Sequence, residues 1–87
     1  MCIFVEIDVP VINVWSLEEL TQQVVNAIGG NKCVVISCML PNWMYFVLLY
    51  RLTQYVETIF SYSRHYGAVC VFSTNDRFRV GDTIDVS

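Results

Sequence analysis

The stretch VVISCMLPNWMYFVLLY, residues Val34–Tyr50, contains no charged residue, and its interpretation decides the fold of the chain. A transmembrane helix needs about 18 or more consecutive apolar residues, and this stretch approaches that length. Ser37, Pro41 and Asn42 interrupt it in the middle, however, and the two halves have different patterns. We therefore predict a strand, a loop and a helix here rather than a membrane span.

The first half, residues 33–37, is short and rich in β-branched side chains, which is typical of a strand covered on both faces. Pro41 suits the first turn of a helix, because its φ is preset and its missing N–H would have had no partner there. Beyond it, apolar residues recur at positions 45, 48, 49 and 52, the spacing of one helix face. The pattern predicts a helix from Pro41 to about Gln54, with further apolar residues on its other faces.

The remaining segments complete a βαβαβββ order. Alternation over residues 2–9 predicts a first strand, and Ser16–Glu19 has the capping-box pattern at the start of an amphipathic helix. Residues 56–62 and 68–73 predict a hairpin, and residues 83–86 predict a last short strand. Because βα crossovers join parallel strands, we expect residues 1–87 to form a single Rossmann-like α/β layer. It has a mixed sheet, two helices and a C-terminal antiparallel hairpin.

The composition favours self-association. Eighty-seven residues form one domain, and 55% of them are hydrophobic, above the ~45–50% of a typical soluble domain. A chain this small buries only about 60% of its unfolded surface on folding, so much apolar area is left for contacts between copies. We expect a homo-oligomer, either a dimer or a larger assembly.

The net charge of −3 argues against binding long nucleic acid, whose usual partner is a strongly basic face. It is compatible with a small anionic ligand held by a few groups. The cysteines Cys2, Cys33, Cys38 and Cys70 form no CxxC pair, so we expect reduced core thiols rather than a zinc site or a disulfide framework. Met1 leads directly into the first strand without a signal-peptide pattern, and we expect a cytoplasmic protein that does not enter the membrane.

Two segments resemble a known family. VVISxxxPxW, from Val34 to Trp43, and GAVxVxS followed by RxGDxIDV, from Gly67 to Val86, are similar to motifs of the small CRISPR-associated ring nucleases of type III systems. The resemblance covers residues 34–86 and implies a CARF-like α/β protein that assembles around the cyclic RNA messenger cyclic tetra-adenylate. Some members of the family cut this ring in the presence of manganese and so end the antiviral response.

Four positions depart from the family's pattern. Tyr45, Thr53 and Thr74 stand where the family has histidine, and Ser63 stands where it has aspartate. These positions carry the family's manganese-dependent cleavage, and a manganese site takes carboxylate, imidazole and water ligands. Since the chain has a single histidine, His65, we predict no metal site and no cofactor, and ligand binding without the family's cleavage mechanism.

The predicted ligand site lies beyond the carboxyl ends of the parallel strands, where α/β sheets bind their ligands. One strand is followed by residues 37–42, which open a helix N-terminus suited to phosphate, and the first strand is followed by Val9-Pro10. The hairpin turn adds a cation and a histidine. The predicted binding residues are Ser37, Cys38, Met39, Asn42, Ser63, Arg64, His65 and Thr74.

Several of these residues also have a purely structural interpretation. Ser37 and Asn42 can be a strand-end hydroxyl and an early helix residue, and Arg64 and His65 can be solvated turn residues. Trp43 fits a core or interface position better than a position that stacks on adenine.

Three functions remain open. The first is a sensor or sink that holds cyclic tetra-adenylate between subunits, because a ring with rotational symmetry suits an isologous interface. The second is a metal-independent ring nuclease, in which Ser63, Arg64 or His65 holds the ribose 2′-OH in line with the adjacent phosphate. The third is an assembly module without a nucleotide ligand. We favour the first.

Overall fold

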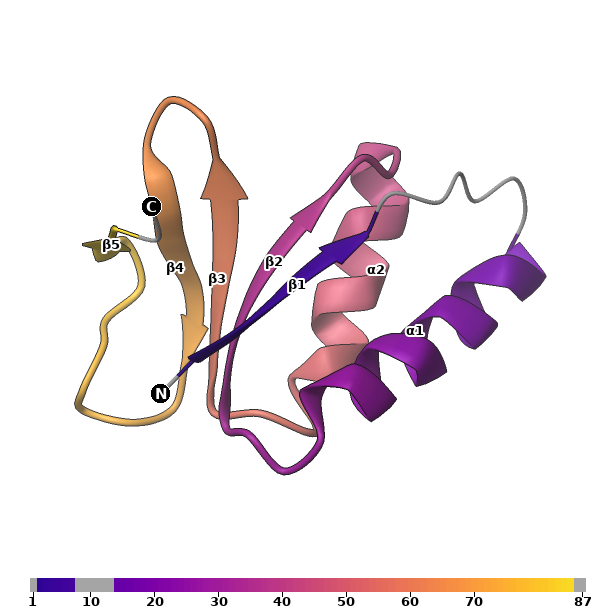
Figure 1. Ribbon diagram of the computed structural model, residues 1–87, viewed down its shortest axis with the longest axis horizontal. Coiled ribbons are helices and arrows are strands. Elements are labelled where there is room, and N and C mark those ends of the chain that lie inside the picture. The colour runs from indigo at the N-terminus through magenta and orange to yellow at the C-terminus, as the bar shows by residue number, and fades with distance from the viewer. Residues whose placement is uncertain (1, 8–13, 86–87) are drawn as a thin grey trace.

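The computed structural model describes residues 2–7 and 14–85 (Figure 1). The elements are β1 (Cys2–Ile7), α1 (Val14–Ile28), β2 (Cys33–Cys38), α2 (Asn42–Leu52), β3 (Thr58–Ser63), β4 (Gly67–Ser73) and β5 (Thr83–Ile84). This confirms the βαβαβββ order. The uncharged stretch is divided between β2 and α2, and none of the described helices is long and apolar enough to cross a membrane.

The strands form one mixed sheet in the order β1-β2-β3-β4-β5. β1, β2 and β3 are parallel, and β4 and β5 continue the sheet antiparallel. The crossovers from β1 to β2 and from β2 to β3 both move in the same direction across the sheet. Because such crossovers are right-handed, their helices lie on the same face of the sheet. Figure 1 shows α1 and α2 together on that face. Since the order never reverses in the described sheet, the architecture is a two-layer mixed α/β sheet without the switch point of a doubly wound Rossmann fold.

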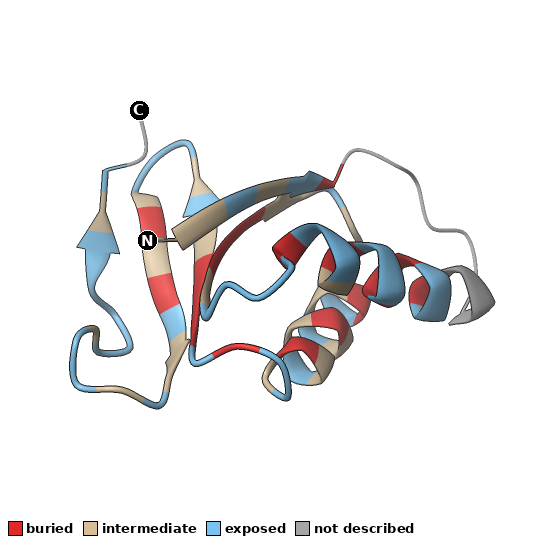
Figure 2. Cartoon of the chain, turned by 60° about the horizontal axis from the view of Figure 1, so that its bottom comes forward, coloured by how far each residue is buried: buried red, intermediate tan, exposed pale blue. Residues whose placement is uncertain are grey.

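The main core lies between the two helices and the sheet (Figure 2). Its buried residues are Ile7, Leu17, Leu20, Val24, Ile28, Val34, Ile36, Met44, Leu48, Leu52, Val56 and Ile59. The predicted stripe on α2 is confirmed at Leu48 and Leu52, which are fully buried, whereas Tyr45 and Leu49 are only half-buried. Burial of one such leucine contributes about 1.5–3 kcal/mol, so this layer supplies most of the driving force for folding.

A second, smaller core covers part of the helix-free face. The chain after β4 folds back over this face, and Phe78 packs edge-on against the buried Phe60 with ring centroids 5.0 Å apart. Gly81, at φ 100°, makes the tight turn, and the Asp82 carboxylate accepts the backbone N–H of Arg79 at 2.9 Å. Gly81 and Asp82 of the RxGDxIDV motif therefore form a turn that leads into β5.

Most predicted boundaries differ by one or two residues from those of the structure, and the starts of α1 and β3 have a physical explanation. Helix α1 begins at Val14, so Ser16 lies inside the helix and the predicted capping box does not mark its start. A capping motif works only where the first N–H groups of the helix lack partners. A sequence pattern alone locates the start of a helix only to within a few residues. β3 begins at Thr58 because the N–H groups of residues 57 and 58 both donate to the carbonyl of Lys32. Val9-Pro10 lies outside the described residues.

The expectation of four reduced thiols is wrong for one pair. Cys2 and Cys33 form a disulfide between the first residues of β1 and β2, with their Cα atoms 4.4 Å apart. The parallel register places these residues opposite each other, although they are 31 positions apart in sequence. Spacing motifs such as CxxC cannot reveal this kind of pair. Cys38 and Cys70 are free, as expected.

Candidate functional site

All but one of the predicted binding residues lie at the same edge of the sheet, at the top of Figure 1. Residues 37–39 end β2 and enter the next loop, and Asn42 is the first residue of α2. Ser63 ends β3, and Arg64 and His65 follow it in the turn to β4. Because β2 and β3 run parallel, their carboxyl ends reach the same edge. We call residues 37–42 and 63–65 the carboxyl-edge site.

Thr74 lies at the opposite edge. It follows β4, which runs antiparallel to β3, and its N–H and hydroxyl both donate to the carbonyl of Glu57, at 2.8 and 3.3 Å. β4 has seven residues, which at about 3.3 Å per residue separates Thr74 from the hairpin turn by about 20 Å. The structure therefore does not bring Thr74 to the carboxyl-edge site. The residue after an antiparallel strand lies at the edge opposite to the residues after its parallel neighbours, which is why Thr74 is separated from the other predicted binding residues.

Tyr45 closes the gap where β2 and β3 separate. The ladder between these strands ends at the pair formed by Ile36 and Ser61. The Tyr45 hydroxyl, from the first turn of α2, donates to Ser61 Oγ at 2.7 Å and lies 3.4 Å from the carbonyl oxygen of Ile36. It thereby fixes the start of α2 against the sheet, directly behind the carboxyl-edge site.

This contact was not predicted from the sequence, in which Tyr45 is part of an apolar helix face and replaces a family histidine, and Ser61 belongs to no motif. The available signal was the hydroxyl itself, because a tyrosine on a core-facing stripe usually finds a hydrogen-bond partner. Which partner it finds depends on the register of β3, and no local pattern gives that.

Tyr45, behind the carboxyl-edge site, and Cys38, within it, are both neutral at pH 7. Burial raises the pKa of the Tyr45 phenol above its usual value, and the hydrogen bond with Ser61 opposes this only in part. Burial also raises the pKa of the Cys38 thiol, against the effect of a hydrogen bond from the Leu40 backbone. Neither group adds a negative charge that would repel a phosphate.

The hairpin turn presents two basic side chains to solvent. Arg64 and His65 are exposed, and neither has an ion-pair partner in the part of the chain that the structure describes. The backbone N–H of His65 donates to Ser63 Oγ at 3.2 Å. The His65 imidazole packs edge-on against the Tyr66 ring. These contacts shape the turn and leave both basic groups accessible to a ligand.

The N-terminus of α2 adds backbone donors to the same edge. Pro41 is the N-cap, and no side chain caps the first turn. The first N–H groups of a helix have no partner within the helix, and together with the helix dipole they attract anions. Asn42 and Trp43, both exposed, flank these donors.

Three aromatic side chains of α2 are exposed. Trp43, Phe46 and Tyr50 are 51%, 66% and 74% exposed, at spacings that place them on one side of the helix. We call these three residues the aromatic patch. Beside it is an apolar hollow of about 310 Å³, whose walls include Phe46, Leu49, Val71 and Phe72. Trp43 is thus not a core residue, and the patch begins next to the carboxyl-edge site.

The described residues contain no group of three or more His, Cys, Asp or Glu side chains that could hold a metal ion. The model of the family described as CRISPR-associated protein (Cas_csx3) matches residues 7–85 of the chain. This confirms the CRISPR-associated part of the resemblance seen in the sequence, and the span includes every predicted binding residue. Comparison with curated proteins found no significant match.

Proposed function

Because the chain belongs to the family of CRISPR-associated proteins named Cas_csx3, we propose that it binds a cyclic oligoadenylate, most simply cyclic tetra-adenylate. It acts in type III antiviral signalling inside the cell, as a sensor or sink with little or no turnover. The observation that carries the proposal is the grouping of uncapped α2 N–H donors with Arg64 and His65 at one sheet edge.

The chemistry of the ligand matches the groups at this edge. Phosphates require N–H donors or cations, which the first turn of α2 and Arg64 supply. Adenines require flat apolar faces and groups that bond their polar edges. Trp43 and Met39, the latter 85% exposed, offer such faces, and the exposed Asn42 offers an amide.

Two copies of the chain hold the ring between them. A cyclic ligand with rotational symmetry suits an isologous interface in which each copy presents the same loop. The aromatic patch supplies apolar area for that interface, because such large exposed side chains are depleted from free surfaces and enriched in interfaces. The assembly is therefore a homodimer or a stack of dimers around the ligand.

Turnover without a metal is the second candidate function. It is favoured by the position of Ser63 beside His65, whose backbone N–H donates to the Ser63 hydroxyl. A ribose 2′-OH held in line with its phosphate at this turn would react slowly through orientation and charge stabilisation alone. Tyr45 does not contribute, because its hydroxyl is engaged by Ser61.

A thermal shift assay with cyclic tri-, tetra- and hexa-adenylate tests the proposal. At a ligand concentration about 100 times Kd, binding adds about 2.7 kcal/mol to the free energy of unfolding, which raises Tm by several degrees. Asn42→Ala and Arg64→Gln should reduce the shift, and the control Arg79→Gln, an exposed arginine outside the carboxyl-edge site, should keep it. Chromatography of each mixture then separates a binder, which leaves the ring intact, from a nuclease. No shift with any ring refutes both functions.

A further inference from the structure

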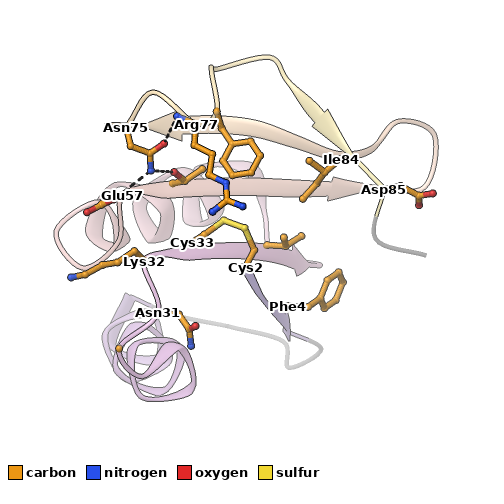
Figure 3. A pocket seen from close by; sticks show the side chains of 14 residues that line it. Cys2, Phe4, Asn31, Lys32, Cys33, Glu57, Asn75, Arg77, Ile84 and Asp85 are labelled. Atoms are coloured by element: carbon orange, nitrogen blue, oxygen red, sulfur yellow. Dashed lines mark hydrogen bonds between the residues drawn. A yellow bond between two sulfur atoms is a disulfide. The ribbon is translucent and has the colours of Figure 1, made fainter.

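The helix-free face of the sheet carries a cavity of about 780 Å³, remote from the carboxyl-edge site (Figure 3). It lies at the amino-terminal ends of β1 and β2, beneath the segment that folds back after β4. Its apolar surface comes from Phe4, Val35, Phe78 and Ile84 together with the Cys2–Cys33 disulfide. Its size is within the range of small-molecule sites, about 300–1,000 Å³.

The disulfide is accessible from this cavity. Cys2 and Cys33 both line it, and neither residue is fully buried. Exchange of a disulfide with a thiol requires that a thiolate reach one of the two sulfur atoms, so access is a condition for the reaction. The free cysteines do not compete for this chemistry, because burial raises the pKa of the Cys38 and Cys70 thiols and keeps them protonated.

Charged groups of both signs surround the disulfide. Lys32, Arg77, Glu57 and Asp85 all line the cavity. The Glu57 carboxylate accepts the side-chain amide of Asn75 at 3.3 Å, and Asp85 has an interaction of its own within the chain. Figure 3 shows Lys32 extending away from the disulfide and the Arg77 guanidinium directed toward it.

Arg77 is the cation best placed to receive a ligand. Its guanidinium has no ion-pair partner in the described part of the chain, and it lies over the Phe78 ring with its central carbon 5.8 Å from the ring centroid. Its backbone N–H donates to Asn75 Oδ1 at 3.0 Å, so the loop is held independently of the guanidinium. A guanidinium of this kind forms charge-assisted hydrogen bonds with a carboxylate.

We propose that this cavity is a reaction site for a low-molecular-weight thiol that carries carboxylate groups, and that the Cys2–Cys33 disulfide undergoes thiol–disulfide exchange there. Arg77 binds a carboxylate of the thiol and so positions its sulfur at the protein disulfide. Glutathione, a tripeptide thiol with two carboxylates and one ammonium group, has the charges that this mixed lining accommodates. This site is independent of cyclic oligoadenylate binding.

The exchange proceeds in two steps. The thiolate of the first ligand attacks one cysteine sulfur, the protein S–S bond breaks, and the other cysteine leaves as a thiolate that takes a proton from water. The thiolate of a second ligand then attacks the mixed disulfide at the ligand's sulfur, which releases the ligand disulfide and the second cysteine. The protein gains two electrons, and two ligand thiols become one disulfide. Reduction removes the covalent link between β1, at the edge of the sheet, and β2.

The test measures reduction of the folded, oxidised full chain by glutathione and, separately, by the uncharged thiol 2-mercaptoethanol. Samples are quenched with iodoacetamide, and intact mass gives the number of alkylated cysteines and any mixed disulfide with time. We expect Arg77→Gln to slow reduction by glutathione about fivefold, as the loss of one exposed ion pair implies, and to leave the 2-mercaptoethanol rate unchanged. Arg77→Lys should restore part of the glutathione rate.

Arg79→Gln is the matched control, because Arg79 is an exposed arginine of the same segment that does not line the cavity. It should react with both thiols at the rate of the unmodified sequence. The proposal is overturned if the disulfide reacts only after denaturation, if Arg77→Gln changes both rates equally, or if Arg79→Gln has the same effect as Arg77→Gln. It is also overturned if the oxidised chain cannot be formed.

Discussion

Removing the Tyr45 hydroxyl should lower the free energy of unfolding by about 1 kcal/mol, the usual net contribution of a neutral hydrogen bond. The substitution Tyr45→Phe keeps the ring and deletes only the donor to Ser61 Oγ, at 2.7 Å. The 3.4 Å approach to the Ile36 carbonyl is too long to add a second full bond. Ser61→Ala should cost a similar amount, because it removes the acceptor of a half-buried hydroxyl.

The two substitutions should not be additive. Either substitution alone already removes the hydrogen bond between Tyr45 and Ser61. The loss of unfolding free energy in the double variant should therefore be about 1 kcal/mol smaller than the sum of the losses in the two single variants. Urea unfolding followed by circular dichroism measures this, since a urea dependence of about 1–3 kcal/mol/M moves the midpoint by about 0.3–1 M per kcal/mol. Tyr66→Phe, at a tyrosine that is 74% exposed, is the control. Additive effects, or equal effects of Tyr45→Phe and Tyr66→Phe, would refute the assigned contact.

Three further outcomes follow from the packing. Asn75→Ala removes two donated hydrogen bonds and one accepted bond, and it should lower the free energy of unfolding, measured with urea, by about 1–3 kcal/mol. The control Asp76→Ala, at an exposed neighbour, should change this free energy by less than about 0.5 kcal/mol. Leu48→Ala, at a fully buried position, should lower the free energy of unfolding by about 2–5 kcal/mol. Phe46→Ala, at an exposed position, should leave the free energy of unfolding of the monomer nearly unchanged but weaken self-association, as measured by sedimentation. Because burial raises the native pKa of Tyr45, the unfolded chain loses this proton first, and the free energy of unfolding should fall as the pH rises above about 10. Tyr45→Phe should make that decline shallower.

Local spacing was sufficient to predict most of the secondary structure. The β-branched run before Ser37 and the apolar spacing after Pro41 divide the uncharged stretch where β2 and α2 divide it. The placement of both helices on one face was not predictable in this way, because it depends on the order of strands in the sheet. The start of α1 was missed because the pattern at Ser16 also occurs inside the first turns of helices.

The location of the candidate site was predictable to the extent that strand direction determines it. Residues after β2 and β3 meet at one edge because βα units make those strands parallel, whereas Thr74 was misplaced because it follows an antiparallel strand. The Tyr45–Ser61 bond and the Cys2–Cys33 disulfide join residues distant in sequence. Both depend on strand register, which local patterns do not determine.

The most direct test of the central claim is a titration of the ¹⁵N-labelled protein with cyclic tetra-adenylate, followed by NMR of the backbone amides. The account predicts that the amides of residues 37–42 and 63–65 shift together and saturate, while those of residues 74–79, at the opposite edge, do not. An absence of shifts, or shifts centred on residues 74–79, would contradict it.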